Sequence, residues 1–248
     1  MRDRLILLPG WGLGISPLEP LAAALRGLDE HLRVDVEPLP DFQLSAFGDI
    51  ELSELLDELD ATLPDNAWLG GWSLGGMLAA ELAARRADRC CGLLTLASNS
   101  CFVSRSDWPN AMSPEAFDAF LAGCTVDPQG TLKRFSLLCV QGAEDPRGLA
   151  RLLNAAAPHT SPDALLYGLK LLAQLDTRNA LQAYRGPQLH VFAGLDALVP
   201  AEAASDLLSV LPDVEIGVIE QASHAFILEN PHGVAAAIQA FLHESGDD

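Results

Sequence analysis

Residues 71–75 spell Gly-Trp-Ser-Leu-Gly, which places Ser73 between two glycines. A short apolar segment precedes this motif and a helical pattern follows it, so the serine is expected in a sharp strand-to-helix turn. Glycine is required on both sides because a side chain there would collide with neighbouring backbone. The turn presents the hydroxyl at the end of the strand, and the start of the next helix favours negative charge. Ser73 is therefore predicted to be a nucleophile.

A serine hydroxyl is a weak nucleophile until a base accepts its proton, and His224 is the candidate base. The chain has six histidines, of which His224 directly follows the last predicted strand, in the run Gln-Ala-Ser-His-Ala-Phe. In parallel sheets the carboxyl ends of the strands share one edge, and ligands bind at that edge. Ser73 is predicted at the same edge, so the two side chains are expected to meet.

The third member of such a triad is a carboxylate that orients the histidine, expected between the serine and the histidine along the chain. Asp196 closely follows a predicted strand at 188–193 and precedes the histidine by 28 residues. Asp176 and Asp206 are competitors, but neither follows a core strand. Asp196 is therefore the predicted orienting acid.

Two backbone N–H groups are predicted to stabilise the oxyanion of the tetrahedral intermediate. One belongs to Leu74, directly after the nucleophile, and the other to Trp11, in the glycine-rich loop 8–14 after the first predicted strand. The Gly-x-Gly of this loop also suggests a dinucleotide-binding loop, with Glu37 as the acidic ribose ligand. Pro17 stands where the third glycine of that motif belongs, which disfavours the alternative.

Short apolar segments that alternate with helical patterns must position these residues, and this alternation predicts a mostly parallel sheet flanked by helices. The predicted strands are residues 4–8, 32–37, 67–70, 92–97, 188–193 and 214–219. The predicted helices between and after them are residues 18–28, 51–63, 75–86, 201–211 and 233–244.

The interval from 100 to 186 breaks this alternation, because helical patterns follow one another there with turn signals between them. An insertion of this size between two strands predicts a helical cap. The expected domains are thus a core made of residues 1–99 and 187–248, and a cap made of residues 100–186.

Composition excludes several classes of function. The formal net charge of −19 disfavours binding to nucleic acid or to anionic membranes, and no apolar run is long enough to cross a bilayer. The five cysteines form no zinc-ligand pattern, so neither a metal nor an organic cofactor is expected. The apolar segment near the N-terminus is too short for a signal peptide. A cytoplasmic monomer is the expectation.

Three stretches give the chain a family resemblance: Leu-Pro-Gly-Trp-Gly-Leu at 8–13, Trp-Leu-Gly-Gly-Trp-Ser-Leu-Gly-Gly at 68–76, and Ser-Cys-Phe-x-x-Arg-x-Asp-Trp-Pro at 100–109. Together they resemble the pimeloyl-[acyl-carrier protein] methyl ester esterases of biotin synthesis, which have the α/β-hydrolase fold. The resemblance implies hydrolysis of a methyl ester on a pimeloyl chain carried by acyl carrier protein, with release of methanol. A general short-chain carboxylesterase and a non-enzymatic binding protein of the same fold are the alternatives.

The resemblance also implies residue roles. Ser73, Asp196 and His224 match the family's triad, and the positions of Trp11 and Leu74 match its substrate contacts. The cap segment at 134–139 resembles a substrate-lining helix, which implicates Phe135 and Cys139; an ordinary apolar helix face explains this segment equally well.

The cap also differs from the core in charge. Residues 100–186 contain eight basic and eight acidic side chains, whereas the rest of the chain has 7 basic and 26 acidic ones. An acidic carrier protein is expected to need a basic surface on this neutral region. The predicted carrier-docking residues are Lys133, Arg134, Arg147 and Arg151, although ordinary solvated side chains would show the same pattern.

Overall fold

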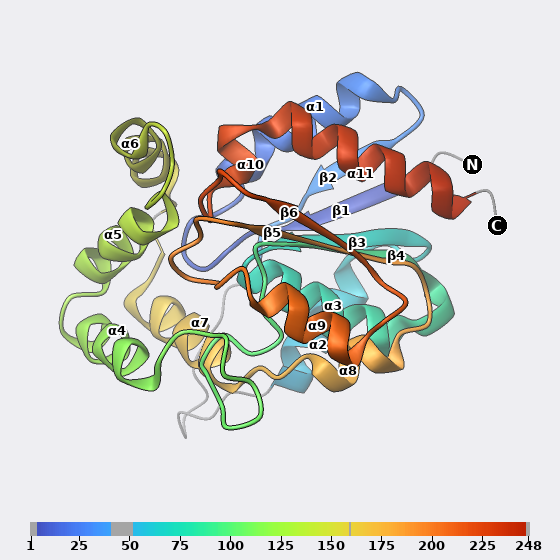
Figure 1. Ribbon diagram of the computed structural model, residues 1–248. Helices are drawn as coiled ribbons and strands as arrows, with labels where there is room; N and C mark the ends of the chain where they lie inside the picture. The colour runs from blue at the N-terminus through green and yellow to red at the C-terminus, as the bar shows by residue number, and fades with distance from the viewer. Residues whose placement is uncertain (1–3, 41–51, 159, 247–248) are drawn as a thin grey trace.

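The computed structural model describes residues 4–40, 52–158 and 160–246. Six strands in these residues form one sheet, in the order β2-β1-β3-β4-β5-β6, and every neighbouring pair is parallel (Figure 1). The direction of winding reverses between β1 and β3, the kind of position at which open α/β sheets bind ligands. The strands are β1 (Arg4–Leu8), β2 (Arg33–Val36), β3 (Ala67–Trp72), β4 (Cys90–Leu96), β5 (Gln188–Ala193) and β6 (Glu215–Ile219).

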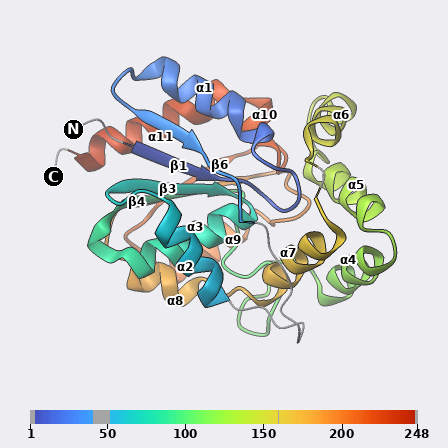
Figure 2. The same cartoon turned by 180° about the vertical axis from the view of Figure 1, so that it is seen from behind.

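Helices cover both faces of the sheet, as parallel connections require. Figures 1 and 2 show α1, α10 and α11 on one face and α2, α3, α8 and α9 on the other. The bounds are α1 (Glu19–Leu28), α2 (Leu52–Thr62), α3 (Leu74–Arg86), α8 (Arg178–Ala183), α9 (Ala203–Val210), α10 (Phe226–Glu229) and α11 (Pro231–Gly246), with short 3-10 helices at Ser16–Leu18 and Ala87–Arg89.

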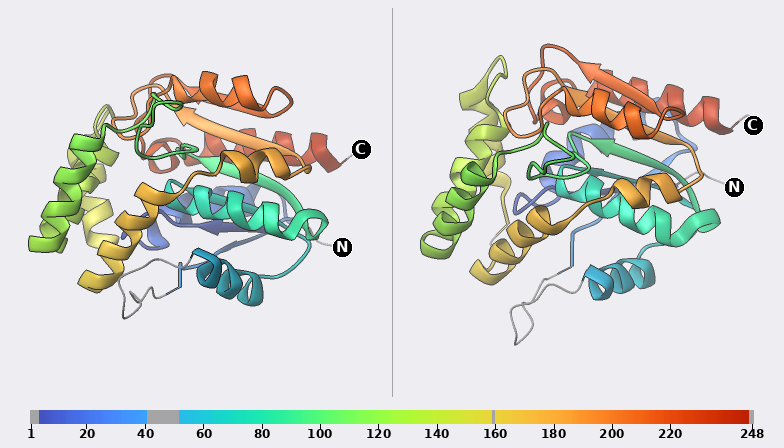
Figure 3. Two further views of the ribbon diagram at one scale, coloured as in Figure 1. Left: turned by 90° about the horizontal axis from the view of Figure 1, so that it is seen from below. Right: turned by 60° about the horizontal axis from the view of Figure 1, so that its bottom comes forward.

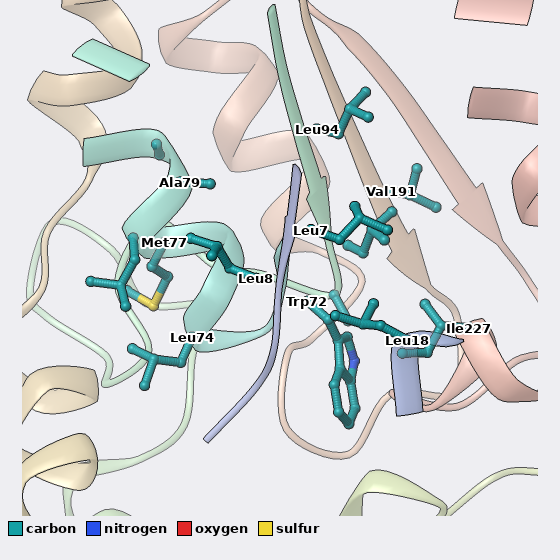
Figure 4. Packing of buried hydrophobic residues seen from close by; sticks show 14 of the residues in the cluster. Leu7, Leu8, Leu18, Trp72, Leu74, Met77, Ala79, Leu94, Val191 and Ile227 are labelled. Carbon is teal, nitrogen blue, oxygen red and sulfur yellow. The ribbon is translucent and has the colours of Figure 1, made fainter. Parts of the chain in front are cut away.

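The central strands are buried on both faces, which explains why they are continuous apolar runs instead of alternating ones. Every residue of β3 and β5 is buried, and the last four residues of β1 are fully covered. Figure 4 shows side chains of β1, α3, β4 and β5 meeting in this core. Burial of one such leucine stabilises the fold by roughly 1.5–3 kcal/mol. The strand ends that carry the candidate site therefore project from a rigid base.

Between β4 and β5 the chain forms α4 (Pro114–Val126), α5 (Pro128–Cys139), α6 (Pro146–Ala156) and α7 (Pro162–Gln174) before α8. Figures 1 and 3 show α4 to α7 beyond the carboxyl ends of the strands. Each of the four begins with proline, after a residue whose side chain accepts a hydrogen bond from the backbone N–H of the third helical residue. These capping residues are Ser113, Asp127, Asp145 and Ser161.

The two ends of this insertion are fastened to each other. The backbone carbonyl of Ser100 accepts a hydrogen bond of 2.9 Å from the backbone N–H of Thr177. Asp176 pairs with Arg105 at 3.2 Å and with Arg178 at 2.6 Å. The chain therefore leaves the core and returns to it at neighbouring positions, which form the base of the insertion.

The predicted fold class is confirmed by this architecture, and most predicted element bounds lie within two residues of those observed. The predicted start of the second helix at Glu51 lies outside the described residues. The domain boundary at 100 and 186 stays a prediction, and α8, inside that interval, packs on α3 of the core. In the part of the chain that the structure describes, no helix is long and apolar enough to cross a membrane.

Candidate active site

Ser73 occupies the sharp turn between β3 and α3, with a φ of 56° and a ψ of −121°. The flanking glycines are required by contact: a Cβ on Gly71 would lie 2.2 Å from the carbonyl carbon of Gly75, and one on Gly75 would lie 2.2 Å from the carbonyl oxygen of Leu8. A backbone in this region is strained for a non-glycine residue. The sharp strand-to-helix turn predicted at Ser73, here called the elbow, is thus present.

His224 and Asp196 form a fully buried pair, with 2.7 Å between His224 Nδ1 and Asp196 Oδ2. The other carboxylate oxygen, Oδ1, accepts hydrogen bonds from the backbone N–H groups of Leu198 at 2.8 Å and Val199 at 2.9 Å. Because a carboxylate only accepts hydrogen bonds, this arrangement places the proton on Nδ1 and leaves Nε2 able to accept one. That is the tautomer which a general base requires.

The two remaining polar atoms of the candidate triad are Ser73 Oγ and His224 Nε2. Both are buried, and neither has a hydrogen-bond partner among the described residues. Buried polar atoms are normally paired, so an unpaired donor and an unpaired acceptor in one region indicate a functional site.

The competing residues have other partners. Asp176 binds Arg105 and Arg178, and Asp206 accepts a hydrogen bond from Asn110. His190 lies inside β5, where burial lowers its pKa to about 3. None of these groups is the partner of His224. His159 lies outside the described residues.

A pocket of about 450 Å³ lies beside the elbow. Its wall includes both predicted oxyanion residues, Trp11 and Leu74, and none of the described residues that line it is charged. Leu74 begins α3, so its N–H has no partner within the helix. The backbone N–H of Trp11 has no acceptor among the described residues. The other lining residues are Pro9, Gly10, Gly12, Gly14, Pro38, Leu39, Pro40, Pro158, Thr160, Ser161, Ala164 and Leu165.

Phe135 and Cys139, predicted to contact substrate, do not line this pocket. Phe135 packs edge-on against the Trp11 ring, with 4.9 Å between ring centroids, and the Trp11 indole N–H donates to the Leu165 carbonyl at 2.8 Å. The Cys139 carbonyl accepts a hydrogen bond from the backbone N–H of Ala225 at 3.0 Å. Burial, and next the charge of Asp196, raise the pKa of the Cys139 thiol. α5 therefore contacts the Trp11 ring and the backbone next to His224, and direct substrate contact by Phe135 and Cys139 stays a prediction.

The four predicted docking residues are exposed on α5 and α6, which pack against each other. In the described part of the chain none of them is in an ion pair. Arg134 donates to Thr131 Oγ1 at 2.7 Å and leans toward α4, whereas Arg147 and Arg151 share one face of α6. The same helices carry exposed apolar side chains, because Leu137 is 58% and Leu152 is 59% exposed.

Sequence reasoning missed several residues that hold the candidate triad. Ser98 Oγ donates to the Ser73 carbonyl at 2.7 Å, and the Trp72 indole N–H donates to the His224 carbonyl at 2.9 Å. Glu229 accepts hydrogen bonds from both the backbone N–H and the hydroxyl of Ser223, next to the histidine. Only Trp72 carried a signal in the sequence, namely its place inside the elbow motif. Among the described residues, no group of three or more histidine, cysteine or acidic side chains could hold a metal ion.

Comparison with known proteins identifies the class. The model of the Alpha/beta hydrolase family matches residues 5–237, and the chain belongs to this family. The pimeloyl-[acyl-carrier protein] methyl ester esterase of Serratia marcescens is 33% identical over 242 residues, covering 96% of this chain and 93% of that protein. The corresponding esterase of Cronobacter sakazakii is 35% identical over 241 residues, covering 95% and 91%.

A bifunctional relative and the solved structures complete the comparison. The chain is 36% identical to the biotin biosynthesis bifunctional protein BioHC of Cellvibrio japonicus, but it spans only 47% of that protein's length. The bromoperoxidase of Bacillus anthracis matches with a TM-score of 0.82 at 19% identity, covering 98% of this chain and 92% of the other. Identity at this level shows the fold alone. The predicted fold, the assignment to ester hydrolases and the resemblance to the methyl ester esterases are confirmed by these relatives.

Proposed function

We propose that this chain is a serine carboxylesterase that hydrolyses the methyl ester of pimeloyl-[acyl-carrier protein] to pimeloyl-[acyl-carrier protein] and methanol, a reaction of biotin biosynthesis. The observation that carries the chemistry is the buried Asp196–His224 pair beside an elbow serine whose hydroxyl has no described partner. The substrate is supported by the names of relatives at 33–36% identity that align over nearly this whole chain.

In the proposed mechanism, Ser73 Oγ attacks the ester carbonyl while His224 Nε2 accepts its proton. Asp196 stabilises the imidazolium that forms. The N–H groups of Leu74 and Trp11 stabilise the oxyanion, and removal of one such donor costs roughly 2.7–4 kcal/mol of transition-state stabilisation. Collapse of the intermediate expels methanol, which receives the proton from His224 Nε2. An acyl ester on Ser73 remains. Water then attacks this ester while His224 Nε2 accepts its proton, and Nε2 passes that proton to Ser73 Oγ as the carboxylic acid leaves.

The pocket suits a neutral ester better than an acid. Among the described residues that line it none is charged, so a methyl ester and its alkyl chain can enter this part of the pocket without unpaired charge. A carboxylate product finds no cationic side chain among the described lining residues, and this favours its release.

The proposed partner is an acidic carrier protein that docks on α5 and α6. The basic side chains of Arg147 and Arg151 on α6, the exposed Leu152 on the same helix and the exposed Leu137 on α5 offer both charge and apolar surface. A strongly negative chain repels an acidic partner at long range, so local complementarity must overcome that repulsion. We further propose that the enzyme acts as a cytoplasmic monomer.

The test is growth without biotin of a bacterial strain that lacks its own methyl ester esterase. Expression of this chain should restore growth, and a Ser73→Ala variant should not. Purified protein should then hydrolyse the carrier-bound methyl ester with a higher kcat/KM than small aryl esters. A preference for small esters would instead indicate a general carboxylesterase, and a stoichiometric phosphonate adduct on Ser73 without any turnover would indicate a binding protein.

A further inference from the structure

Trp72, the last residue of β3, connects parts of the site that are far apart in the chain. Its side chain is fully buried, and its indole N–H donates to the backbone carbonyl of His224 at 2.9 Å. The two residues are 152 positions apart. A buried indole N–H without an acceptor carries a large desolvation cost, so this hydrogen bond specifies where the histidine backbone lies.

The same peptide unit is held from its other side. The N–H of Ala225, which shares a peptide plane with the His224 carbonyl, donates to the Cys139 carbonyl at 3.0 Å. One end of the plane is thus bonded to β3 of the core and the other to the last residue of α5. Since the His224 ring is bonded to Asp196, little freedom remains for the base.

Trp72 also contacts the other two parts of the machinery. It is covalently joined to Ser73, so the position of its ring is tied to the position of the nucleophile. A Cβ on Gly10, in the loop that precedes Trp11, would lie 3.1 Å from Trp72 Cε3 and 3.4 Å from Ser73 Cβ. The Trp72 and His224 ring centroids are 5.5 Å apart. Figure 4 shows Trp72 where β1 ends.

We propose that Trp72 is a positioning residue: through its indole N–H it sets the separation of Ser73 Oγ and His224 Nε2. This inference rests on the proposed role of His224 as base. The alternative is that Trp72 only fills the core. Trp68 provides the comparison, because it lies on the same strand, is 7% exposed and packs edge-on against Phe241, with 5.7 Å between ring centroids.

The test compares Trp72→Phe with Trp68→Phe, since the two changes remove the same atoms from one strand. Both should lower the melting temperature. For Trp72→Phe, kcat on a small aryl ester should fall by roughly 10- to 100-fold with KM unchanged, because misplacement of a reacting group by about 1 Å has effects of this size. The rate of Ser73 phosphonylation should fall by the same factor. For Trp68→Phe both rates should stay within about twofold of wild type.

A second variant decides the matter if Trp72→Phe does not fold. Site-specific replacement of Trp72 by benzothienylalanine keeps the ring size and removes only the N–H donor, so it should reproduce the loss in kcat. Equal losses for the positions 72 and 68, or a loss below twofold at position 72, would overturn the inference. The proposed function fails separately, if the unchanged protein does not hydrolyse the carrier-bound ester.

Discussion

The carboxyl edge of the sheet and the helical insertion above it differ in burial and in how their polar side chains are paired. At the edge, the side chains of Asp196 and His224 are fully buried and joined by defined hydrogen bonds. On the insertion, Arg147 and Arg151 are exposed and have no described ion-pair partner. The edge takes its geometry from strands that are far apart in the chain, whereas the insertion takes its form from local helix caps. Chemistry and recognition are therefore expected to respond separately to mutation.

The largest effect is expected from Ser73→Ala, which removes the nucleophile from the edge. Loss of a triad serine lowers kcat by roughly 10⁶-fold. The loss should be the same for a carrier-bound ester and for a small free ester, since both use one hydroxyl. Steady-state assays on the two substrates, together with circular dichroism for the fold, check this expectation. Activity above a few per cent of wild type would refute the assignment of Ser73.

The next effect is expected from Asp196→Asn, which should lower kcat by roughly 10⁴-fold because an amide favours the wrong histidine tautomer. Asp176→Asn is the matched control, because Asp176 is also hydrogen-bonded and partly buried but belongs to the base of the insertion. That control should lower the melting temperature, whereas its effect on kcat should be small. If the two variants exchanged these behaviours, the choice of acid would be wrong.

Charge reversal on the insertion should separate the two regions. For Arg147 and Arg151 changed together to Glu, we expect KM for the carrier-bound ester to rise roughly tenfold, because complementary charges steer association. Hydrolysis of a small free ester should be unchanged, and added salt should weaken carrier turnover by wild type more than by the variant.

Arg185→Glu, which changes the net charge by half as much as the double variant, is the control for net charge at an exposed site outside α5 and α6. Equal losses on both substrates would mean that the insertion was damaged. No loss on either substrate would place the carrier elsewhere.

The smallest effect is expected at the junction of the two regions, where Glu81 of α3 lies in a cavity with Leu171 and Asp176. Burial, and next the charge of Asp176, raise the pKa of Glu81 to about 7 from its usual 4.5. The folded state binds this proton more tightly than the unfolded chain. The stabilisation that this tighter proton binding gives the folded state is complete below pH 4.5 and is lost as the pH rises to about 7.

Glu81→Gln should therefore raise the free energy of unfolding by about 1–2 kcal/mol at pH 8, after allowance for solvent screening, and by little at pH 4.5. Urea unfolding at both pH values measures this difference, and kcat should not change. Glu115→Gln, at an exposed site on α4, controls for the loss of one negative charge. An equal gain at both pH values would show that the Glu81 carboxyl does not cause the effect.

The sequence was sufficient to predict a mostly parallel sheet flanked by helices and the candidate side chains at its carboxyl edge. Ser73, Asp196 and His224 could be found because each follows an apolar strand, and parallel strands bring such positions together. Position along the chain carried that information. What could not be predicted are contacts that depend on tertiary packing, such as the bond from Trp72 to the His224 carbonyl.

The predicted docking residues illustrate the same limit. Helical spacing correctly places Arg147 and Arg151 on one face of α6. It does not indicate that Arg134 leans over α4, because that direction depends on which helices flank α5. Likewise, helical periodicity assigned α8 to the insertion, and only the folded chain brings it against α3.

The bond between Ser100 and Thr177 also bears on how the chain folds. Pairing β4 with β5 requires closure of a loop of roughly 90 residues. If the insertion forms first, from helices that each carry a start signal, this bond leaves roughly 15 residues to be closed. Loop entropy grows with the logarithm of length, so the saving is about 1.6 kcal/mol. An insertion that formed first would thereby lower the entropic cost of bringing β4 and β5 together.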